Sequence, residues 1–315
     1  MISHLRRSVS PGLAYTEETI MNGLLIIDKP AGVTSHDVVA RVRKLCQERS
    51  VGHLGTLDPM ATGVLPLALG NHTRLAQFYG ETRKSYDGTI RFGFATDTYD
   101  ADGDPVEPAA GTRDTQELTL DEIRRAAATF TGRIRQMPPD FSAKKIKGVP
   151  AYKLARKKQE IELEAVEVEV RRFEVTGFSD GLASFEAEVS SGTYVRSLAH
   201  DLGQKLGVGA HLASLRRTKV GEFEIAEAVS FDELERRIAA SDVESILIHP
   251  RRVLQTMPAV TANEEQVAFI RNGRAVNLPE LSSSELVRVY ASQRELVAIC
   301  RRIAGTLFQP KVVLS

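Results

Sequence analysis

The sequence predicts an α+β fold, with a main domain built on a central mixed or antiparallel sheet and a small β-rich domain near the C-terminal end. Three observations support this class. Short apolar runs in the first quarter of the chain are typical of buried strands, and alternating runs in the middle are typical of half-buried antiparallel strands. Helix-capping signals recur between these runs. At 315 residues the chain is long enough for two domains.

The first elements follow from local patterns. Residues 1–20 are expected to be a flexible N-terminal extension, and no apolar signal core follows Arg6 and Arg7 within it. The run Gly23–Pro30 predicts a buried strand that leaves the sheet at Asp28. Thr34 or Ser35 then caps a helix that places apolar residues at helical spacing on one face.

The stretch Ser50–Gly70 is a glycine-shaped loop followed by a second buried strand, Val64–Leu69. A single carboxylate, Asp58, lies in the loop, and Pro59 fixes the backbone after it. A stiff loop joined to a core strand positions one reactive group accurately, which favours a functional role. The alternative is an ordinary turn, since Asp before Pro commonly starts turns.

The next segment alternates between helix and strand. The residue pattern predicts a short helix over His72–Tyr79, a strand over Lys84–Phe94 and a helix from Thr119 to about Phe130. The acidic turn Thr96–Asp104 has the aspartate spacing of a calcium loop. It lacks the glutamate that such a loop needs at its end, so we interpret it as a solvated connector.

Two alternating runs, Glu162–Val175 and Ala183–Ser190, predict antiparallel strands joined by a turn at residues 179–181. Thr193 is expected to cap a helix that carries Tyr194 and Arg196 in its first turns, with Gly203 or Gly207 at its end. Arg196 is either a surface arginine or a buried one that holds a carboxylate or a phosphate. The segment 211–218 leads into a further strand, and a capping box at residues 230–233 opens another helix.

From about Arg252 the sequence predicts a short helix, Thr261–Asn272, and three strands over residues 286–291, 295–301 and 306–313. About sixty residues are near the lower size for independent folding, so this domain should pack on the main body or be tethered to it.

The chain is neutral, with 41 basic and 41 acidic residues, but its charge is unevenly distributed. Nine lysines and arginines lie between Arg133 and Lys158, with Asp140 as the one acid, interleaved with Phe141 and Tyr152. The alternative is a solvated face. A concentrated basic segment with aromatic residues in a neutral chain favours binding to RNA.

Several function classes are disfavoured. The seven histidines show no zinc-ligand spacing, so no metal site is expected. No phosphate-binding glycine loop follows a strand, which argues against a nucleotide cofactor. The GxSxG elbow of a serine hydrolase is also missing.

Cys46 and Cys300 are far apart and are expected to be reduced thiols. No apolar run is long enough for a membrane span, so we expect a soluble cytoplasmic protein.

Five motifs taken together resemble the bacterial tRNA pseudouridine-55 synthases of the TruB family. They occur in family order over about residues 22–313, and they are Gly23–Pro30, Gly52–Pro66, Lys84–Tyr86, Ser191–Ser197 and Leu215–Arg217. The resemblance implies a pseudouridine synthase catalytic domain over residues 21–250 and a PUA-like RNA-binding domain over residues 251–315. It also implies that residues 131–160 form a basic insertion that closes over the RNA.

The resemblance further implies the reaction and its residues. The family isomerises a T-loop uridine of tRNA to pseudouridine without a cofactor. Asp58 matches the nucleophile, Arg196 the arginine that keeps it ionised, and Tyr86 the tyrosine that stacks on the flipped base and takes the C5 proton. The remaining matches are residues that bind the substrate or support the loop, with His53 filling the space of the flipped nucleotide: His53, Lys29, Pro30, Arg74, Lys145, Tyr194 and Leu215.

The implied partner is the T-arm of tRNA, for a monomer with no membrane association and no obligatory protein partner. Two alternatives remain. A guide-RNA-directed synthase of the related ribosomal-RNA-modifying branch would need protein partners and guide RNA. An RNA chaperone with a vestigial site would not need Asp58, Tyr86 and Arg196, and chaperone activity could also coexist with catalysis.

Overall fold

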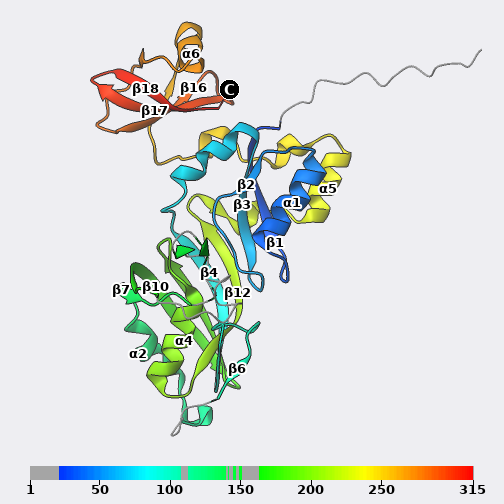
Figure 1. Cartoon of the computed structure of the whole chain (residues 1–315), viewed down its shortest axis with the longest axis vertical. Helices are drawn as coiled ribbons and strands as arrows, with labels where there is room; N and C mark the ends of the chain where they lie inside the picture. Colours follow the sequence, from blue (N-terminus) through cyan, green and yellow to red (C-terminus); the bar gives the residue numbers. More distant parts are fainter. Residues whose placement is uncertain are drawn as a thin grey trace, which may run out of the picture.

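The computed structural model describes residues 21–107, 113–139, 141, 145–146, 149–150 and 163–314. The predicted extension 1–20, and most of the predicted basic insertion 131–160, lie outside these residues. The described chain forms two main β-sheets with helices packed against them, so the α+β class is confirmed. Figure 1 shows an elongated molecule with the smaller sheet at one end.

The large sheet is built from strands of the main domain. Its order is β1-β3-β12-β4-β11-β10-β7, with β2 paired to β3 and β13 paired to β12. The strands are β1 Gly23–Lys29, β2 Val51–His53, β3 Thr62–Leu69, β4 Lys84–Phe92, β7 Gly132–Gln136, β10 Val166–Ser179, β11 Leu182–Val189, β12 Ala210–Val220 and β13 Phe223–Glu224. All the pairings are antiparallel except that of β3 with β12, so the sheet is mixed.

The smaller sheet has the order β14-β16-β17-β18-β15. Its strands are β14 Ala259–Thr261, β15 Val276–Asn277, β16 Leu286–Tyr290, β17 Leu296–Ala304 and β18 Leu307–Val313. Two further hairpins pair β5 Ala95–Thr96 with β6 Pro105–Val106, and β8 Lys145–Ile146 with β9 Val149–Pro150. The three predicted C-terminal strands therefore form, as β16, β17 and β18.

Five α-helices lie in the described chain: α1 Ser35–Cys46, α2 Leu120–Ala128, α4 Val195–Leu206, α5 Phe231–Ala239 and α6 Glu264–Arg271. Short 3-10 helices are η1 Gly70–Phe78, η2 Thr115–Glu117, η3 Ile225–Glu227, η4 Val243–Ile246 and η5 Pro250–Arg252. None of the helices in this part of the chain is both long and apolar enough to cross a membrane.

The caps explain where the helices begin. Thr34 caps α1 through a reciprocal capping box with Asp37, and Ser230 caps α5 by accepting the Glu233 N–H. The predicted Thr193 cap of α4 is wrong: the N-cap is Tyr194, and its side chain makes no capping bond. The Tyr194 N–H is instead bonded by a residue of another element, because Gln136 Oε1 on β7 accepts it at 2.8 Å. As expected, a glycine ends α4, namely Gly207 in the left-handed conformation.

The strands β1 and β3 are apolar over residues 23–27 and 63–69 because both of their faces are covered there. Leu25 and Ile27 of β1 pack in the core shared with α1 and α5, whereas Leu24 and Ile26 pack in a second core on the opposite face. That second core also contains Tyr290 and other residues of the smaller sheet. The C-terminal domain therefore packs on the main body through a shared apolar core, as its small size predicts.

The segment 211–218 was expected to lead into a strand and is itself the middle of β12. This strand lies against both halves of the large sheet, pairing with β3 in parallel and with β4 antiparallel. At the parallel contact Gly63 has φ +100°, and a Cβ atom there would lie 2.2 Å from the Arg217 carbonyl oxygen. Only glycine permits this approach, which brings β12 beside the Asp58 loop.

Candidate active site

The loop that carries Asp58 connects β2 to β3. Its apolar neighbour Leu57 is buried, with 4% of its surface exposed, whereas the Asp58 side chain is 35% exposed. The loop is therefore buried next to Asp58, while the Asp58 carboxylate itself is accessible to solvent. This arrangement is suited to reaction with an external molecule.

Arg217 holds the first half of the loop. The side chain is fully buried, and its three nitrogens donate to the carbonyl oxygens of Val64, Thr56 and Gly55 at 2.8, 2.9 and 3.1 Å. A buried guanidinium that satisfies three backbone carbonyls fixes their relative positions. Arg217 was part of a sequence motif, but its role as an anchor was not predicted.

Ser35 and Lys29 hold the second half. Ser35 Oγ accepts the Leu57 N–H at 2.9 Å and donates to the Leu57 carbonyl at 3.0 Å. The buried Lys29 ammonium donates to the carbonyl oxygens of Pro30, Val33 and Pro59 at 2.9, 2.8 and 3.0 Å. Burial lowers the pKa of Lys29 to about 8, and the negative charge of Asp58 opposes this shift. The peptides on both sides of Asp58 are therefore anchored.

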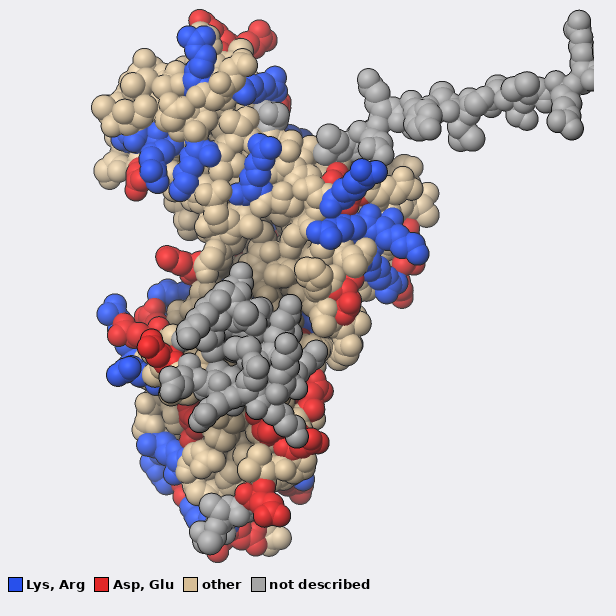
Figure 2. Space-filling model, viewed as in Figure 1, with Lys and Arg blue, Asp and Glu red and all other residues tan. Residues whose placement is uncertain are grey.

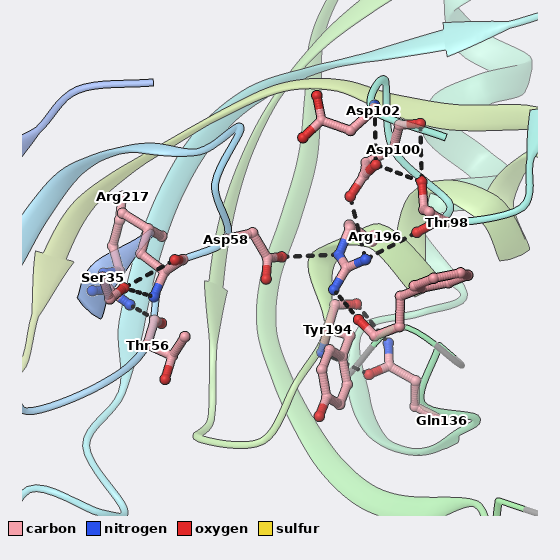
Figure 3. A network of polar contacts seen from close by, with 12 residues as sticks. Ser35, Thr56, Asp58, Thr98, Asp100, Asp102, Gln136, Tyr194, Arg196 and Arg217 are labelled. Carbon is pink, nitrogen blue, oxygen red and sulfur yellow. Dashed lines mark hydrogen bonds and ion pairs between the residues drawn. The ribbon is translucent and has the colours of Figure 1, made fainter. Parts of the chain in front are cut away.

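Arg196 lies across from the loop on the first turn of α4, where its side chain is 6% exposed. Its Nε forms an ion pair with Asp58 Oδ2 at 2.9 Å, as expected. The other two nitrogens donate to the carbonyl oxygens of Thr98 and Phe141, each at 3.0 Å. Figure 3 shows Asp58 between two groups of side chains, with Arg217 and Ser35 on one side of it and Arg196 on the other.

Asp100 forms a second ion pair with Arg196, at 3.2 Å from its Nη1. The interpretation of the turn Thr96–Asp104 as a solvated connector is therefore wrong, since Asp100 is only 4% exposed. Burial raises the pKa of Asp100, while the Thr98 hydroxyl and the positive charge of Arg196 oppose the shift. Local sequence patterns give no signal for this contact between Asp100 and Arg196, because the two residues are 96 positions apart.

Tyr86 lies on β4 directly opposite Arg217 of β12. Its side chain is buried in the same core as Leu57 and Leu215, and burial raises the pKa of the phenol. The negative charge of Asp58 raises this pKa further, whereas Arg217 lowers it. Tyr86 and Leu215 thus lie beneath the loop that carries Asp58.

The other predicted residues differ in their distance from this centre. His53 ends β2, and burial lowers the pKa of its imidazole. Tyr194 precedes Arg196 and is tied through its backbone to Gln136. Arg74 lies away from the loop, on η1, where it donates to the Val313 carbonyl of the smaller sheet at 2.8 Å. The side chain of Lys145 is outside the described residues.

Among the described residues no cluster of histidine, cysteine and acidic side chains could hold a metal ion.

Two domain families match the chain over most of its length. The N-terminal domain of the TruB family pseudouridylate synthases matches residues 43–195, and the tRNA pseudouridylate synthase B C-terminal domain matches residues 196–260. The junction of the two matches falls between Val195 and Arg196, at the start of the helix that supplies the arginine of the site.

Curated relatives resemble the chain at full length. The tRNA pseudouridine synthase B of Solibacter usitatus is 42% identical, with 93% of this chain and all of the relative covered. The enzyme of the same name from Aquifex aeolicus is 39% identical with the same coverage. Among solved structures, the crystal structure of a Cbf5-Nop10-Gar1 complex contains a chain with 25% identity and a TM-score of 0.70, covering 93% of this chain and 85% of that one.

Proposed function

This chain belongs to the TruB family of pseudouridine synthases, and we propose that it isomerises the T-loop uridine at position 55 of tRNA to pseudouridine. Conversion of a uridine in tRNA is the activity that its curated relatives are named for. The assignment to position 55 rests on the motifs shared with the family, and the proposed mechanism rests on the geometry of the Asp58 site.

In the proposed mechanism Asp58 attacks the ribose and the bond between C1′ and uracil N1 breaks. The attack leaves C1′ bonded to an Asp58 oxygen; the detached uracil turns, C5 bonds to C1′ as the C1′–Asp58 bond breaks and the carboxylate is released, N1 gains a proton and C5 loses one, so the atoms balance without a cofactor. The observation that carries this proposal is a partly exposed carboxylate whose loop is anchored at Gly55, Thr56, Leu57 and Pro59. Such anchoring holds the attacking oxygen in place during the reaction.

Arg196 has a proposed positioning role. Its Nε forms an ion pair with Asp58 Oδ2 at 2.9 Å, which holds the carboxylate in one orientation. Its second ion pair and two backbone contacts fix the direction of the guanidinium. Arg196 therefore positions Asp58, and this role needs no contact with the substrate.

The uridine must leave the T-loop before Asp58 can reach its ribose, which costs a few kcal/mol of unstacking. We assign Tyr86 to stacking on the flipped base and to the C5 proton. In this proposal His53 takes the space that the nucleotide vacates, while Tyr194, Leu215 and the Lys29–Pro30 pair shape and support the pocket. Their positions around the loop support these assignments.

The RNA-binding surface is proposed to extend from this site to the C-terminal domain. On the face shown in Figure 2, basic side chains gather around the junction of the smaller sheet with the main body and over α1 and α5. Arg74 lies at that junction and is exposed. We accordingly propose a catalytic unit over residues 21–250, a PUA-like RNA-binding unit after it, and a monomer that acts on tRNA in the cytoplasm without a partner protein.

The test is tritium release from tRNA labelled at uridine C5, because forming the new glycosidic bond expels that atom. The wild-type protein should release one tritium per tRNA, and Asp58→Asn should release none while still binding tRNA. Asp121→Asn is the matched control, since that side chain is 80% exposed on α2. Release by Asp58→Asn at the wild-type rate would rule out the proposed nucleophile.

The same assay tests the guide-directed alternative. A guide-directed synthase would be inactive on bare tRNA until guide RNA and partner proteins are added. The chaperone alternative needs a separate tRNA-refolding assay: if the protein is a chaperone, the Asp58→Asn variant should refold tRNA as well as the wild-type protein does, whether or not the wild-type protein also forms pseudouridine.

A further inference from the structure

The turn Thr96–Asp104, here named the aspartate turn, presents Asp100 to Arg196 in a defined orientation. Asp100 Oδ1 accepts hydrogen bonds from the Thr98 hydroxyl at 2.6 Å and from the Asp102 N–H at 3.1 Å. This leaves Oδ2 for the ion pair with Arg196. The Thr98 carbonyl accepts a bond from the same guanidinium. Two residues of the aspartate turn, separated by Tyr99, therefore contact Arg196.

Tyr99 has φ +66°, a left-handed conformation that is unfavourable for a bulky side chain. A non-glycine residue in this region costs roughly 1–2 kcal/mol, so an interaction elsewhere must favour it. The backbone on one side is fixed by the Leu212 N–H of β12, which donates to the Tyr99 carbonyl at 3.0 Å. On the other side the ring lies flat on His200, with centroids 3.8 Å apart and planes 18° apart.

His200 follows Arg196 by four positions on α4, so the two side chains lie on the same helix face. One helix face therefore holds three consecutive residues of the aspartate turn: Arg196 contacts Thr98 and Asp100, and His200 stacks on Tyr99. The buried His200 Nδ1 has no hydrogen-bond partner in the described structure. The contact of the imidazole with the aspartate turn is made by its ring face.

We propose that the Tyr99–His200 stack is a positioning device for catalysis, which fixes the aspartate turn on α4 so that Asp100 and the Thr98 carbonyl aim Arg196 at Asp58. This inference rests on the proposed function of Asp58. Tyr99 and His200 act through Asp100 and Arg196, and neither touches the reacting atoms. Loss of the stack should let the aspartate turn shift against α4 and rotate the guanidinium.

The test measures single-turnover pseudouridine formation and tRNA affinity separately. Tyr99→Gly removes the ring but accepts the left-handed backbone, and His200→Ala removes the opposite ring. Each should slow the single-turnover rate about ten- to a hundredfold, the effect of a misplacement near 1 Å, with the tRNA Kd changed less than about twofold. Tyr99→Phe and His200→Phe keep a ring in place and should retain the wild-type rate within about threefold.

A double variant tests the route of the effect. If the stack acts through Arg196, which both Asp100 and the Thr98 carbonyl contact, adding His200→Ala to Arg196→Lys should slow the reaction no further. A purely structural stack would lower the urea midpoint of His200→Ala and leave its single-turnover rate in buffer unchanged, which overturns the inference. Equal losses in His200→Phe and His200→Ala, or additive losses in the double variant, overturn it as well. Wild-type protein without activity would instead refute the proposed function.

Discussion

Ser35→Ala tests whether anchoring of the Asp58 loop matters for both folding and rate. The serine is 3% exposed, and its hydroxyl is the hydrogen-bond partner of both the N–H and the carbonyl of Leu57. Alanine fits the space but leaves both backbone groups unpaired in a buried position. An unsatisfied buried group costs about 1–3 kcal/mol, so the two together should lower the unfolding free energy by about 2–3 kcal/mol after some relaxation of the loop.

The rate should fall because Asp58 is the next residue along the loop. A displacement near 1 Å is enough to lower kcat by about ten- to a hundredfold, and KM should change little because Ser35 does not face the solvent. The chain has no tryptophan, so urea unfolding is followed by far-ultraviolet circular dichroism. The rate is followed by tritium release from C5-labelled tRNA.

Thr34→Ala is the matched control. It removes the N-cap of the same helix at a cost of about 1 kcal/mol but touches no residue of the Asp58 loop. Its kcat should equal that of the wild-type protein. If Ser35→Ala and Thr34→Ala showed the same kcat and the same small loss of stability, the reasoning about the anchored loop would be refuted.

Three further substitutions probe other parts of the account. Asp100→Asn removes one of the two carboxylates on Arg196 and should lower the single-turnover rate about tenfold or more with tRNA affinity unchanged. Gly63→Ala places a methyl group against the Arg217 carbonyl and should cost about 3 kcal/mol or more in urea unfolding. His72→Gln should flatten the stability profile between pH 6.5 and 4. Burial lowers the pKa of His72 to about 4, so the unfolded chain gains a proton first and stability falls by up to about 3 kcal/mol over that window.

Each of these has a control in the same chain. Asp102→Asn alters an exposed carboxylate of the aspartate turn and should leave the rate unchanged. Gly132→Ala has a similar φ of +104° but open space around its Cβ, so it should cost less than Gly63→Ala. His36→Gln changes an exposed histidine and should keep the pH profile. Equal effects within any of these pairs would contradict the corresponding argument.

The strands and most helices could be predicted because their signals are local. The apolar runs at β1 and β3 indicate strands buried on both faces, and the shared core explains why no polar residue alternates with them. The Thr119 and Ser230 caps likewise open helices at the expected residues. The glycines and Pro59 around Asp58 indicated a shaped loop before any contact was known.

What could not be predicted are contacts between residues far apart in sequence. Asp100 was interpreted as solvated because its neighbours are acidic and polar, yet it is buried since Arg196 lies beside it. The cap at Thr193 failed for a similar reason, because Gln136 on β7 takes the N–H at the start of α4. Ser35 and Arg217 also act on a loop that is more than twenty positions away. Local patterns contain no information about such pairings.

The most direct test is to map pseudouridine in a bare T-arm hairpin incubated with the purified protein alone, and with Asp58→Asn in parallel. The account predicts one pseudouridine at the T-loop uridine that corresponds to position 55 with the wild-type protein, and unmodified RNA that is still bound with the variant. The account would be contradicted if both proteins modified that uridine, or if the wild-type protein left it unmodified.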